Sequence, residues 1–485
     1  MRPLHDIPLA GTALDQLRAM QGDRLEGLRR FIRETGDIGR LRLFGNIVIL
    51  NTPELVHEAL VVRARSIEKS PIQRGALHPL VGQGLFTSEG DLWRRQRKLM
   101  APMFHPGTLR RFAADMTSSA ERGARTWEDG ATLDIARETT RITMAIAGKT
   151  LFDADTFGES DELGAALTTA LDWAGEQSAS LTLIFQARAS VALERIAAKV
   201  PALAPRLREL AEKVLVPIRW PGKRSAALSA ALGILDERVA RLIADRRAHP
   251  RGKHDLLGLL LDARDDDGAA MSDQQIRDEV LTLFVAGHET TATALAWTLM
   301  LLAQHPDIYA NVRKEVDALG RVPTYDDLDA LPLSLRVFKE ALRLYPPVYI
   351  FGRVVVSDVE IGGYLFPKGT IVLVSPYALQ RRAHLWPDPD RFDPDRFLPE
   401  EEARRHRAAF IPFSAGPRTC IGNTFALIEG PLVLATLLHY ADVALVDPRG
   451  AEPEASATLR AKGGIPMRVS RRRSATRGAT DAPPP

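Results

Sequence analysis

Cysteine is nearly absent from this sequence, since Cys420 is the only one among 485 residues. One cysteine cannot form a disulfide within the chain, and it cannot build a cysteine-rich zinc or iron–sulfur site. A chain without disulfides is typical of a reducing compartment, so we expect a cytoplasmic protein.

Long uninterrupted hydrophobic runs are also missing. The first twenty residues lack the apolar stretch of a signal peptide or a membrane anchor. The long apolar segment 280–303 is interrupted by Gly287, His288 and Glu289. A histidine beside a glutamate is costly at the centre of a bilayer, so we expect a buried helix of a soluble core and no membrane anchor.

An excess of charge of one sign is lacking as well. The 64 Lys and Arg residues are nearly balanced by 61 Asp and Glu, which gives a formal net charge of +3 and does not indicate a nucleic-acid partner. Internal repeats and linkers are absent, so residues 1–470 are expected to form one domain, and we expect a monomer. A basic cluster and three prolines make residues 471–485 an expected disordered tail.

Local patterns predict a few strands among many helices. Residues 40–50 alternate around a turn at Gly45-Asn46, and residues 353–374 repeat this with turns at 362–363 and 368–369. Helical spacing covers residues 227–248, and a capping box of Ser272 with Gln275 opens a helix that reaches Gln304. The fold class is therefore mainly α with small β-sheets (α+β).

The middle of this last helix contains residues that a packed core would not favour. The segment 281–297 places a glycine, two ionisable side chains and four threonines among apolar residues. Such a polar notch often marks a helix distortion, such as a π-bulge, at a functional site. The alternative is a polar patch whose groups are satisfied by neighbouring helices.

The lone cysteine lies in the segment FSAGPRTCIG, residues 413–422, just before another helical pattern. A helix N-terminus stabilises a thiolate, and Gly416 and Gly422 allow backbone to approach a large flat group. A single thiolate suits an axial haem ligand better than a metal cluster. An inert buried cysteine is the alternative, although the five-position pattern F-x-x-G-x-R-x-C-x-G is far more specific than one residue.

With this motif the chain resembles the cytochrome P450 superfamily, and its pattern is similar to that of the soluble bacterial fatty-acid hydroxylases. The resemblance runs from Trp93 to residues 463–466 and rests on four motifs in a fixed order. They are Trp93-x-x-x-Arg97, the oxygen-binding segment 286–291, Glu340-x-x-Arg343 with Arg396, and the cysteine loop. The resemblance implies the cytochrome P450 fold, with the long central helix over the haem of a haem domain spanning 1–470.

The resemblance also implies roles for individual residues. The cofactor is haem b (iron protoporphyrin IX), with Cys420 as the iron ligand. Glu289 and Thr290 would relay protons to bound oxygen, whereas His288 would have a structural role on the helix surface. Glu340, Arg343 and Arg396 would form a buried charge network under the haem. The remaining cofactor-binding residues implied are Trp93, Arg97, Arg353, Phe413, Arg418 and Gly422. Gln380 departs from the family, which often has histidine there.

The activity implied is that of a haem-thiolate monooxygenase (EC 1.14 class). It would insert one oxygen atom from O2 into an apolar small molecule by hydroxylation or epoxidation. The acid–alcohol pair Glu289–Thr290 favours a monooxygenase over a peroxide-using or non-oxidative rearranging enzyme. It also favours a monooxygenase over a haem-binding sensor, because a sensor needs no proton relay. The pocket would be lined by Phe86, Ala286, Val348 and Ile465.

Electrons are expected from NAD(P)H through a separate ferredoxin or flavodoxin with its reductase, because the chain has no room for a flavin or iron–sulfur domain. Two basic segments would flank the cysteine loop and steer an acidic donor, unless they are only solvated surface. Their cations are Arg94, Arg95, Arg97 and Lys98 in the first segment and Arg404, Arg405 and Arg407 in the second.

Overall fold

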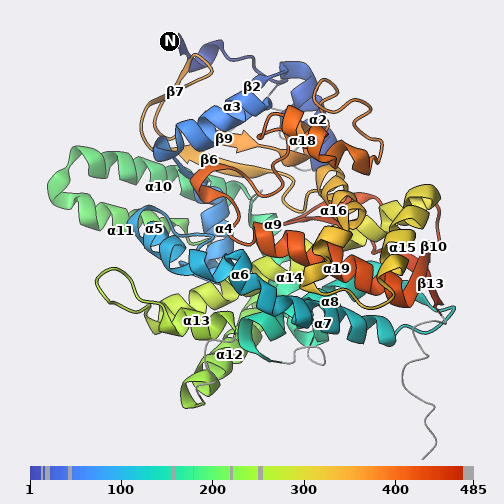
Figure 1. Cartoon of the computed structure of the whole chain (residues 1–485). Coiled ribbons are helices and arrows are strands. Elements are labelled where there is room, and N and C mark those ends of the chain that lie inside the picture. The colour runs from blue at the N-terminus through green and yellow to red at the C-terminus, as the bar shows by residue number, and fades with distance from the viewer. Residues whose placement is uncertain are drawn as a thin grey trace, which may run out of the picture.

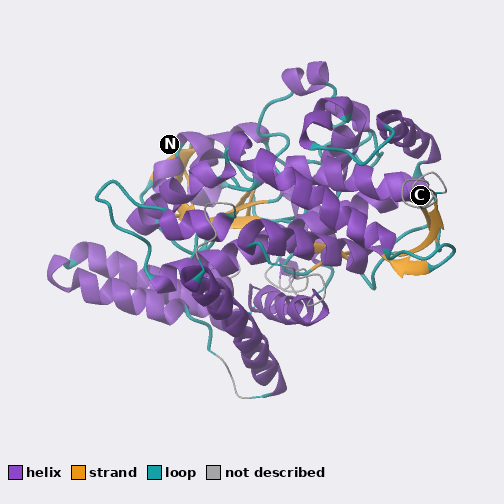
Figure 2. Cartoon of the chain, turned by 60° about the horizontal axis from the view of Figure 1, so that its bottom comes forward, coloured by secondary structure: helices purple, strands orange, loops and turns teal. Residues whose placement is uncertain are grey.

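The computed structural model describes residues 1–12, 15–16, 22–41, 46–154, 160–178, 180–218, 222–249 and 255–472. Helices dominate this part of the chain, and the strands lie in small groups at the margins of the helical body (Figure 2). The mainly α class with small sheets is therefore confirmed.

The helices are labelled in Figure 1 where there is room. In the first half of the described chain they are α2 (Arg24–Thr35), α3 (Pro53–His57), α4 (Pro71–Val81), α5 (Gly90–Met100), α6 (Pro106–Leu109), α7 (Ala113–Arg125), α8 (Ile135–Phe152), α9 (Ser160–Ser178), α10 (Leu181–Lys199), α11 (Ala204–Leu215) and α12 (Lys223–Ala248). The second half holds α13 (Leu256–Asp262), α14 (Asp273–Gln304), α15 (Pro306–Leu319), α16 (Pro332–Leu344), α17 (Pro376–Leu379), α18 (Pro399–Arg404) and α19 (Asn423–Tyr440).

The described strands form four small sheets. The largest has the order β2-β3-β9-β6-β4 and joins β2 (Ile38–Leu41), β3 (Ile47–Leu50), β4 (Ile67–Lys69), β6 (Phe351–Val355) and β9 (Ile371–Val374). A second sheet, with the order β10-β13-β5, contains β5 (Thr132–Asp134), β10 (Ala441–Leu445) and β13 (Pro466–Arg471). A third sheet, with the order β1-β8-β7, contains β1 (Arg2–Pro3), β7 (Val359–Ile361) and β8 (Tyr364–Phe366). The fourth pairs β11 (Pro453–Ala455) with β12 (Leu459–Ala461).

Both predicted strand regions are confirmed. Strands β2 and β3 pair antiparallel with Ile38 opposite Leu50, while Gly45 of the predicted turn lies outside the described residues. In the second region β7 and β8 form a hairpin, and β6 pairs with β9. The turn glycines adopt the left-handed backbone that favours glycine, with φ of 59° at Gly362 and 85° at Gly369.

Helix α14 crosses the molecule and organises the core. Its predicted capping box is present, because Ser272 Oγ accepts from the Gln275 N–H and the Gln275 side chain accepts from the Ser272 N–H. Residues 280–285 and 291–302 are buried all round, as expected for an interior helix. Helices α8, α16 and α19 pack against it, and α19 lies in front of it in Figure 1.

The folded part of the chain continues slightly past the predicted boundary at residue 470. Arg471 is the last residue of β13. Arg472 donates from its backbone to the Tyr440 carbonyl at 3.0 Å and forms an ion pair with Asp317 at 2.6 Å. The rest of the predicted tail, residues 473–485, lies outside the described residues. No helix in the described ranges is long and apolar enough to cross a membrane.

Candidate active site

Cys420 lies between the short helix η9 (Gly416–Arg418) and the N-terminus of α19. Its backbone N–H donates to the Phe413 carbonyl at 2.9 Å, which closes the loop on itself. Burial raises the pKa of the thiol, while the Gly422 N–H and the Arg97 guanidinium lower it. The side chain is nevertheless exposed, so the sulfur lies at the base of a recess rather than in a closed core.

The two glycines of this loop have different roles. A Cβ on Gly416, whose φ is 73°, would lie 2.0 Å from the Leu60 carbonyl oxygen. Gly416 is therefore required by the close approach of backbone from the short π-helix η2 (Glu58–Val62), not by a flat group as the sequence suggested. A Cβ on Gly422 would lie 3.9 Å from Cys420 Sγ, so only Gly422 borders the thiol.

Helix α14 opens to the recess over one short segment. Within its otherwise buried interior, only Ala286, Gly287, Glu289 and Thr290 are partly exposed. The first turn of α19, residues 423–427, is partly exposed too, before α19 becomes buried. Helix α14 packs against α19, and Thr291, next to the open segment, hydrogen-bonds Glu429 of α19, so the two partly exposed segments lie near the same contact between the helices.

The polar notch does not distort the helix as predicted. Helix α14 is α-helical without interruption over Asp273–Gln304. Its polar groups are satisfied locally instead, because Thr290 Oγ1 donates to the Ala286 carbonyl at 2.7 Å and Thr143 Oγ1 donates to the His288 carbonyl at 2.9 Å. The alternative of a patch satisfied by its own helix and its neighbours describes this segment.

His288 has a structural environment, but it is not on the helix surface. Its side chain is buried and stacks on Phe284 with ring centroids 5.8 Å apart. One ring nitrogen, Nδ1, lies 2.9 Å from the Phe284 carbonyl oxygen. Burial lowers the pKa of His288 to about 4, so it is neutral at physiological pH.

Glu289 is held from a distant part of the chain. Its Oε1 accepts from Thr458 Oγ1 at 2.7 Å, at the tip of the β11–β12 hairpin. Burial raises the pKa of the Glu289 carboxyl, which Arg460 lowers and Asp172 raises. Arg460 in turn pairs with Asp172 at 2.8 Å, nearer the surface. A lone threonine in a loop carries no motif, so no sequence pattern predicts this contact.

Two of the arginines predicted to bind the haem propionates, Arg97 and Arg353, remain available to bind an anionic group. Arg97 makes no hydrogen bond or ion pair with any described residue, and burial lowers its pKa while Cys420 raises it. Arg353 is buried beside Ser414, to which it donates at 3.1 Å. Burial, helped by the positive charge of Arg418, lowers the pKa of Arg353 to about 10, whereas Glu89 raises it. A buried cation in this setting fits an anionic ligand group.

Arg418 is already engaged by a carboxylate. Its Nε and Nη2 donate to both oxygens of Glu89, at distances of 2.5 to 3.1 Å. The Lys69 ammonium lies 3.8 Å from the same carboxylate, and the Arg418 guanidinium lies 4.7 Å from the centre of the Trp93 ring. Arg418 therefore binds Glu89 and packs over Trp93. Glu89 was not among the predicted site residues, because a buried carboxylate is not expected beside the anionic propionates.

The buried charge network has the expected geometry. Arg343 binds both oxygens of Glu340 at 2.6 and 2.7 Å, and Arg396 Nε lies 3.5 Å from the same carboxylate. Gln380, which departs from the family pattern, is fully buried and donates to the Arg343 carbonyl. It also accepts from the Ile411 N–H, so it connects α16 to the segment that enters the cysteine loop.

The four predicted pocket residues do not all lie together. Ala286 is on the open segment of α14, and Phe86 and Val348 are 40% and 36% exposed in their loops. Ile465 is fully buried, and its backbone bonds Asp134 and Ile135 beside β5. The segment of the C-terminal region that reaches α14 is instead the β11–β12 tip at Thr458.

These residues fit haem b. The Cys420 thiol would supply the iron ligand, and Arg97 and Arg353 would supply cations for the two propionates. Gly287 faces open space, since a Cβ there would meet nothing within 4 Å. The α14 wall can thus accommodate a flat group and a ligand above it.

The comparisons with known proteins identify the class. Residues 1–463 match the family model for Cytochrome P450, so the chain belongs to the cytochrome P450 family. The crystal structure of the cytochrome P450DA heme domain superposes with a TM-score of 0.81 and 28% identity, over 97% of this chain and 98% of that one. The fold is thus the cytochrome P450 fold, and the cofactor of the family is haem.

Similar proteins include three from Streptomyces, two of which are named as oxygenases. Cyclooctatin synthase of Streptomyces melanosporofaciens is 35% identical over 437 residues, which cover 89% of this chain and 87% of the relative. Pentalenene oxygenase of Streptomyces avermitilis is 32% identical over 412 residues and 84% of each chain. Cyclooctat-9-en-7-ol 5-monooxygenase of S. melanosporofaciens is 33% identical over 406 residues, 83% of this chain and 81% of the relative. The protein is a cytochrome P450 monooxygenase.

Proposed function

We propose that this protein inserts one oxygen atom of O2 into an apolar polycyclic small molecule, with electrons delivered by a separate redox protein. The observation that carries the proposal is the juxtaposition of the recessed Cys420 thiol with the open segment of α14 that holds Glu289 and Thr290. The lone cysteine supports a reducing compartment, the cytoplasm, as the place of action.

The cofactor residues have separate tasks. Bound haem iron supplies the binding and reductive cleavage of O2, which a thiolate ligand favours by donating electron density. Cys420 would hold the iron, and its thiolate charge would be stabilised by the Gly422 N–H. Arg97 and Arg353 would bind the two carboxylates of the cofactor, and Phe413, Trp93 and Gly422 are the remaining residues that the family pattern assigns to its binding.

The reaction consumes two protons and two electrons for each O2, places one oxygen atom in the product and releases the other as water. Thr290 donates its hydroxyl hydrogen to the Ala286 carbonyl, so its oxygen is free to accept a hydrogen bond on the open side of the helix. Glu289 has a raised pKa, so it retains a proton at higher pH than an exposed carboxyl. It can therefore supply protons to Thr290, and Arg460 with Asp172 links it toward the surface.

The substrate class rests on the relatives and on the lining. Pentalenene and cyclooctat-9-en-7-ol are, by their names, an alkene and an alkenol, and the enzymes that act on them resemble this chain over most of its length. The candidate lining residues Phe86, Ala286 and Val348 are apolar, which suits a hydrocarbon skeleton. NAD(P)H would feed electrons through a reductase to a ferredoxin or flavodoxin.

The decisive experiment follows isotopic oxygen into product. The purified haem protein would be titrated with pentalenene, cyclooctat-9-en-7-ol, a fatty acid, a steroid and a macrolide, scoring the blue shift of the Soret band. Turnover of the best binder under 18O2, with a ferredoxin and its reductase, should place one labelled atom in the product and one in water. Labelled product from peroxide alone would overturn the proposal in favour of a peroxide-using enzyme, and binding without O2 consumption would favour a sensor.

A further inference from the structure

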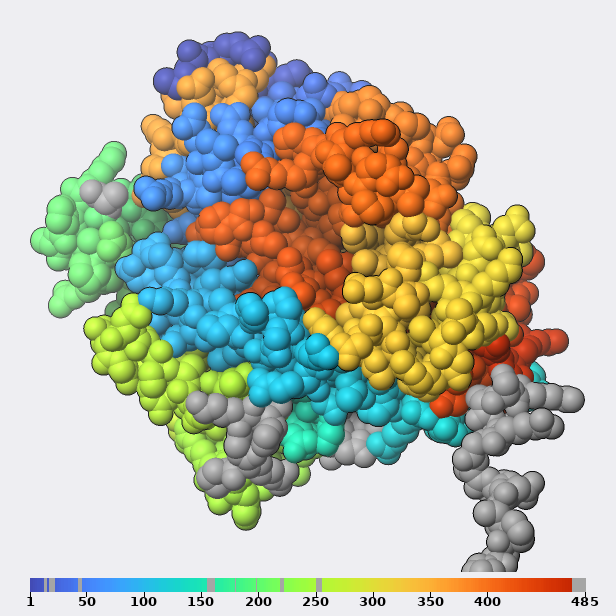
Figure 3. All heavy atoms as spheres, in the orientation of Figure 1, coloured from blue at the N-terminus to red at the C-terminus, as the bar shows by residue number. Residues whose placement is uncertain are grey.

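Two surfaces flank the cysteine loop, and their charges differ. One is the α5 flank, made of α5 and the loop 263–270 that faces it. The other is the η2 flank, made of Val61, Val62, Arg63, Arg65 and Arg407. Figure 3 shows this face of the molecule, with the red-orange cysteine loop at the surface beside blue segments. The inference below rests on the proposed function, because it concerns where the electron donor binds.

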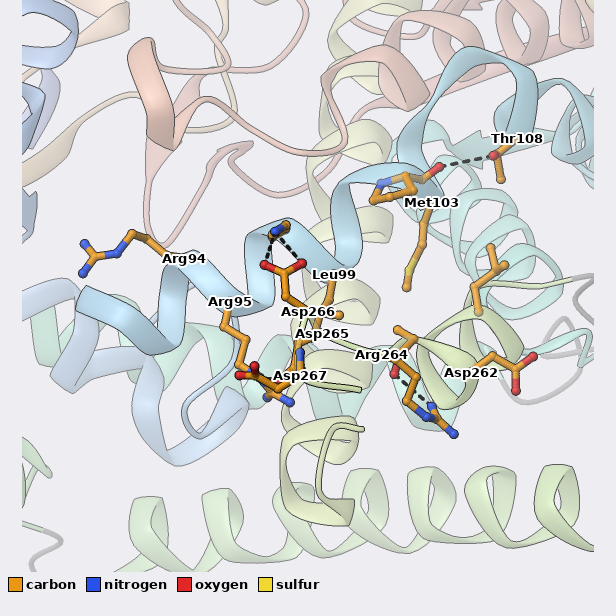
Figure 4. A pocket seen from close by; sticks show the side chains of 14 residues that line it. Arg94, Arg95, Leu99, Met103, Thr108, Asp262, Arg264, Asp265, Asp266 and Asp267 are labelled. Atoms are coloured by element: carbon orange, nitrogen blue, oxygen red, sulfur yellow. Dashed lines mark hydrogen bonds and ion pairs between the residues drawn. The ribbon is translucent and has the colours of Figure 1, made fainter. Parts of the chain in front are cut away.

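The α5 flank already pairs its cations with carboxylates of the same chain. Lys98 Nζ lies 2.5 and 2.7 Å from the two oxygens of Asp266, and Arg95 Nε lies 2.6 Å from Asp265 Oδ2. Arg95 also donates to the Ala270 carbonyl, which ties it into the acidic loop. Arg94 points away from this loop in Figure 4 and pairs with Asp91.

These pairs border a groove of about 640 Å³ between α5 and α13 (Figure 4). Four of the lining residues are cations and four are carboxylates, so the groove has no excess of positive charge. The cations are Arg94, Arg95, Lys98 and Arg264, and the carboxylates are Asp262, Asp265, Asp266 and Asp267. The basic segment that the sequence predicted as a docking face is therefore neutralised by a loop 170 residues further along the chain.

The η2 flank has the opposite character. Arg65 and Arg407 are exposed, and neither makes an ion pair or a hydrogen bond within the described residues. Arg63 lies 3.8 Å from Glu58, a loose contact between two solvent-accessible side chains. His406, which precedes Arg407, packs edge-on against His57 of α3 with ring centroids 5.6 Å apart, so Arg407 lies beside the end of α3. The flank thus offers unpaired positive charge.

An apolar centre accompanies these arginines. Val61 and Val62 are 36% and 60% exposed at the end of the η2 π-helix. The backbone of η2 packs directly on Gly416, since a Cβ there would meet Leu60 O at 2.0 Å and Val61 Cα at 3.4 Å. Exposed apolar side chains rimmed by charge mark protein interaction sites, and this one abuts the loop that ends at Cys420.

We infer that an acidic electron-transfer protein docks on the η2 flank, with Val61 and Val62 at the centre and Arg63, Arg65 and Arg407 at the rim, and not on the α5 flank. An acidic partner gains from unpaired cations directly, whereas on the α5 flank it would first have to displace Asp265 and Asp266. Contact through η2 also brings the donor against the cysteine loop itself.

The test compares two charge-reversal variants of equal net charge. Arg65→Glu/Arg407→Glu alters the η2 flank, and Arg94→Glu/Lys98→Glu alters the α5 flank by the same amount, so any long-range effect of total charge is matched. Arg97 stays unchanged because it faces Cys420. Reduction by a reduced, acidic [2Fe–2S] ferredoxin is followed by stopped flow under CO, from low to physiological ionic strength. The ferrous–CO Soret band and reduction by dithionite confirm that each variant is folded and loaded.

The η2 variant should be reduced about tenfold more slowly than the parent at low ionic strength, with a flattened salt dependence. The α5 variant should stay within about twofold, as expected for exposed pairs. A third variant, Val62→Ser, should weaken ferredoxin binding in calorimetry at every ionic strength, because it removes apolar contact and not charge.

Each other outcome overturns the inference. If the α5 variant is slowed as much as the η2 variant, or more, the donor binds at α5 or across both flanks. Unchanged rates in both variants, with a parent that is readily reduced, place the docking surface elsewhere and leave the proposed function standing. A parent that no ferredoxin or flavodoxin reduces, but that turns over with peroxide, removes the proposed function and the docking surface together.

Discussion

The two helices that wall the recess, α14 and α19, present their chemical groups in different ways. In α14 the groups lie in the middle of the helix and bond its own backbone, as Thr290 does with the Ala286 carbonyl. At α19 the thiol lies before the helix, in a loop fixed by distant segments: η2 packs on Gly416, and Gln380 bonds Ile411. The backbone of α14 thus stays helical through its own hydrogen bonds, although Thr458 binds Glu289 from a distant segment, whereas the backbone of the cysteine loop depends on long-range contacts.

This difference predicts how substitutions separate function from fold. Changes at the open segment of α14 should alter proton delivery and leave binding and stability nearly intact. Changes around the cysteine loop should affect cofactor and structure together. The following predictions test this contrast, beginning with the largest effect.

Cys420→Ser should abolish monooxygenase activity, because the sequence holds no second thiolate to replace it. The ferrous–CO complex should lose the red-shifted Soret band that a thiolate ligand produces. Absorption spectra of the reduced CO complex measure this directly, with the far-ultraviolet circular dichroism as the control for folding. Survival of the band in the Ser variant would show that another residue holds the iron.

Thr290→Ala should lower product formation by about 10²-fold or more, the usual contribution of a positioned proton-transfer group. Substrate affinity should be nearly unchanged, and the electrons consumed should appear as peroxide or water. The matched control is Thr298→Ala, because Thr298 makes the same kind of bond to the Ala294 carbonyl but is fully buried beyond the recess. Product yield per NAD(P)H should stay at the parental value in the control. Equal yields in both variants would remove Thr290 from the relay.

The two helices should also impose opposite pH dependences on stability. Burial lowers the pKa of His288 on α14 to about 4, below its ordinary 6.5. Between these values the unfolded chain binds a proton that the native state does not, so stability is lost as the pH falls through this window. Burial raises the pKa of Glu429 on α19 from 4.5 to about 8, so the native state holds a proton that the unfolded chain releases. That contribution is lost as the pH rises through this second window.

Thermal unfolding from pH 4 to pH 9 measures both effects. His288→Gln should flatten the acid side of the stability profile, and Glu429→Gln should flatten the alkaline side. Glu429 is buried and Thr291 is the side chain whose hydrogen bond lowers its pKa, so the Gln variant keeps the shape and an acceptor oxygen for Thr291 while it removes the titration. Profiles that are displaced but unchanged in shape would show that neither group titrates as inferred.

The smallest effect on stability is expected at the rim of the pocket. Phe86→Ala should change the site of oxidation or the range of substrates, because Phe86 is 40% exposed and contributes little to the core. Its loop stays anchored to α14, since Glu279 accepts from the Leu85 N–H and Asp278 from the Gln83 N–H. Product analysis should show the change while Tm moves little. Phe112→Ala, at a buried phenylalanine, is the control and should cost about 3–5 kcal/mol. A large loss of Tm without a new product would make Phe86 a core residue.

Sequence reasoning worked best where one short segment carries the information. The capping box at Ser272, the turn glycines at 362–363 and the Glu340–Arg343 pair are local patterns, and each has the expected geometry. It failed where the partner is distant in the chain. Asp266 against Lys98 is such a case, because no local pattern states which helix a loop will reach.

The predicted helix distortion failed for another reason. A threonine in a helix can bond the carbonyl four residues earlier, so polar composition alone does not distinguish a bulge from an unbroken helix. The family pattern predicts a structural, surface role for His288, because an imidazole ligand would occupy the site that oxygen needs. That argument does not determine which way the side chain faces, and the sequence does not show its burial or its stacking on Phe284.

The β11–β12 hairpin has a consequence for recombining this enzyme with its relatives. Its tip bonds Glu289 through Thr458 and Asp172 through Ser456, and the Ser456 carbonyl accepts from Tyr349, next to Val348. A chimera that exchanges the hairpin alone would separate Ser456, Thr458 and Arg460 from partners on three other segments. Crossover points in a shuffled library should therefore keep residues 456–460 with positions 172, 289 and 349 from one parent, so that selection for a new substrate does not discard proton supply in the same step.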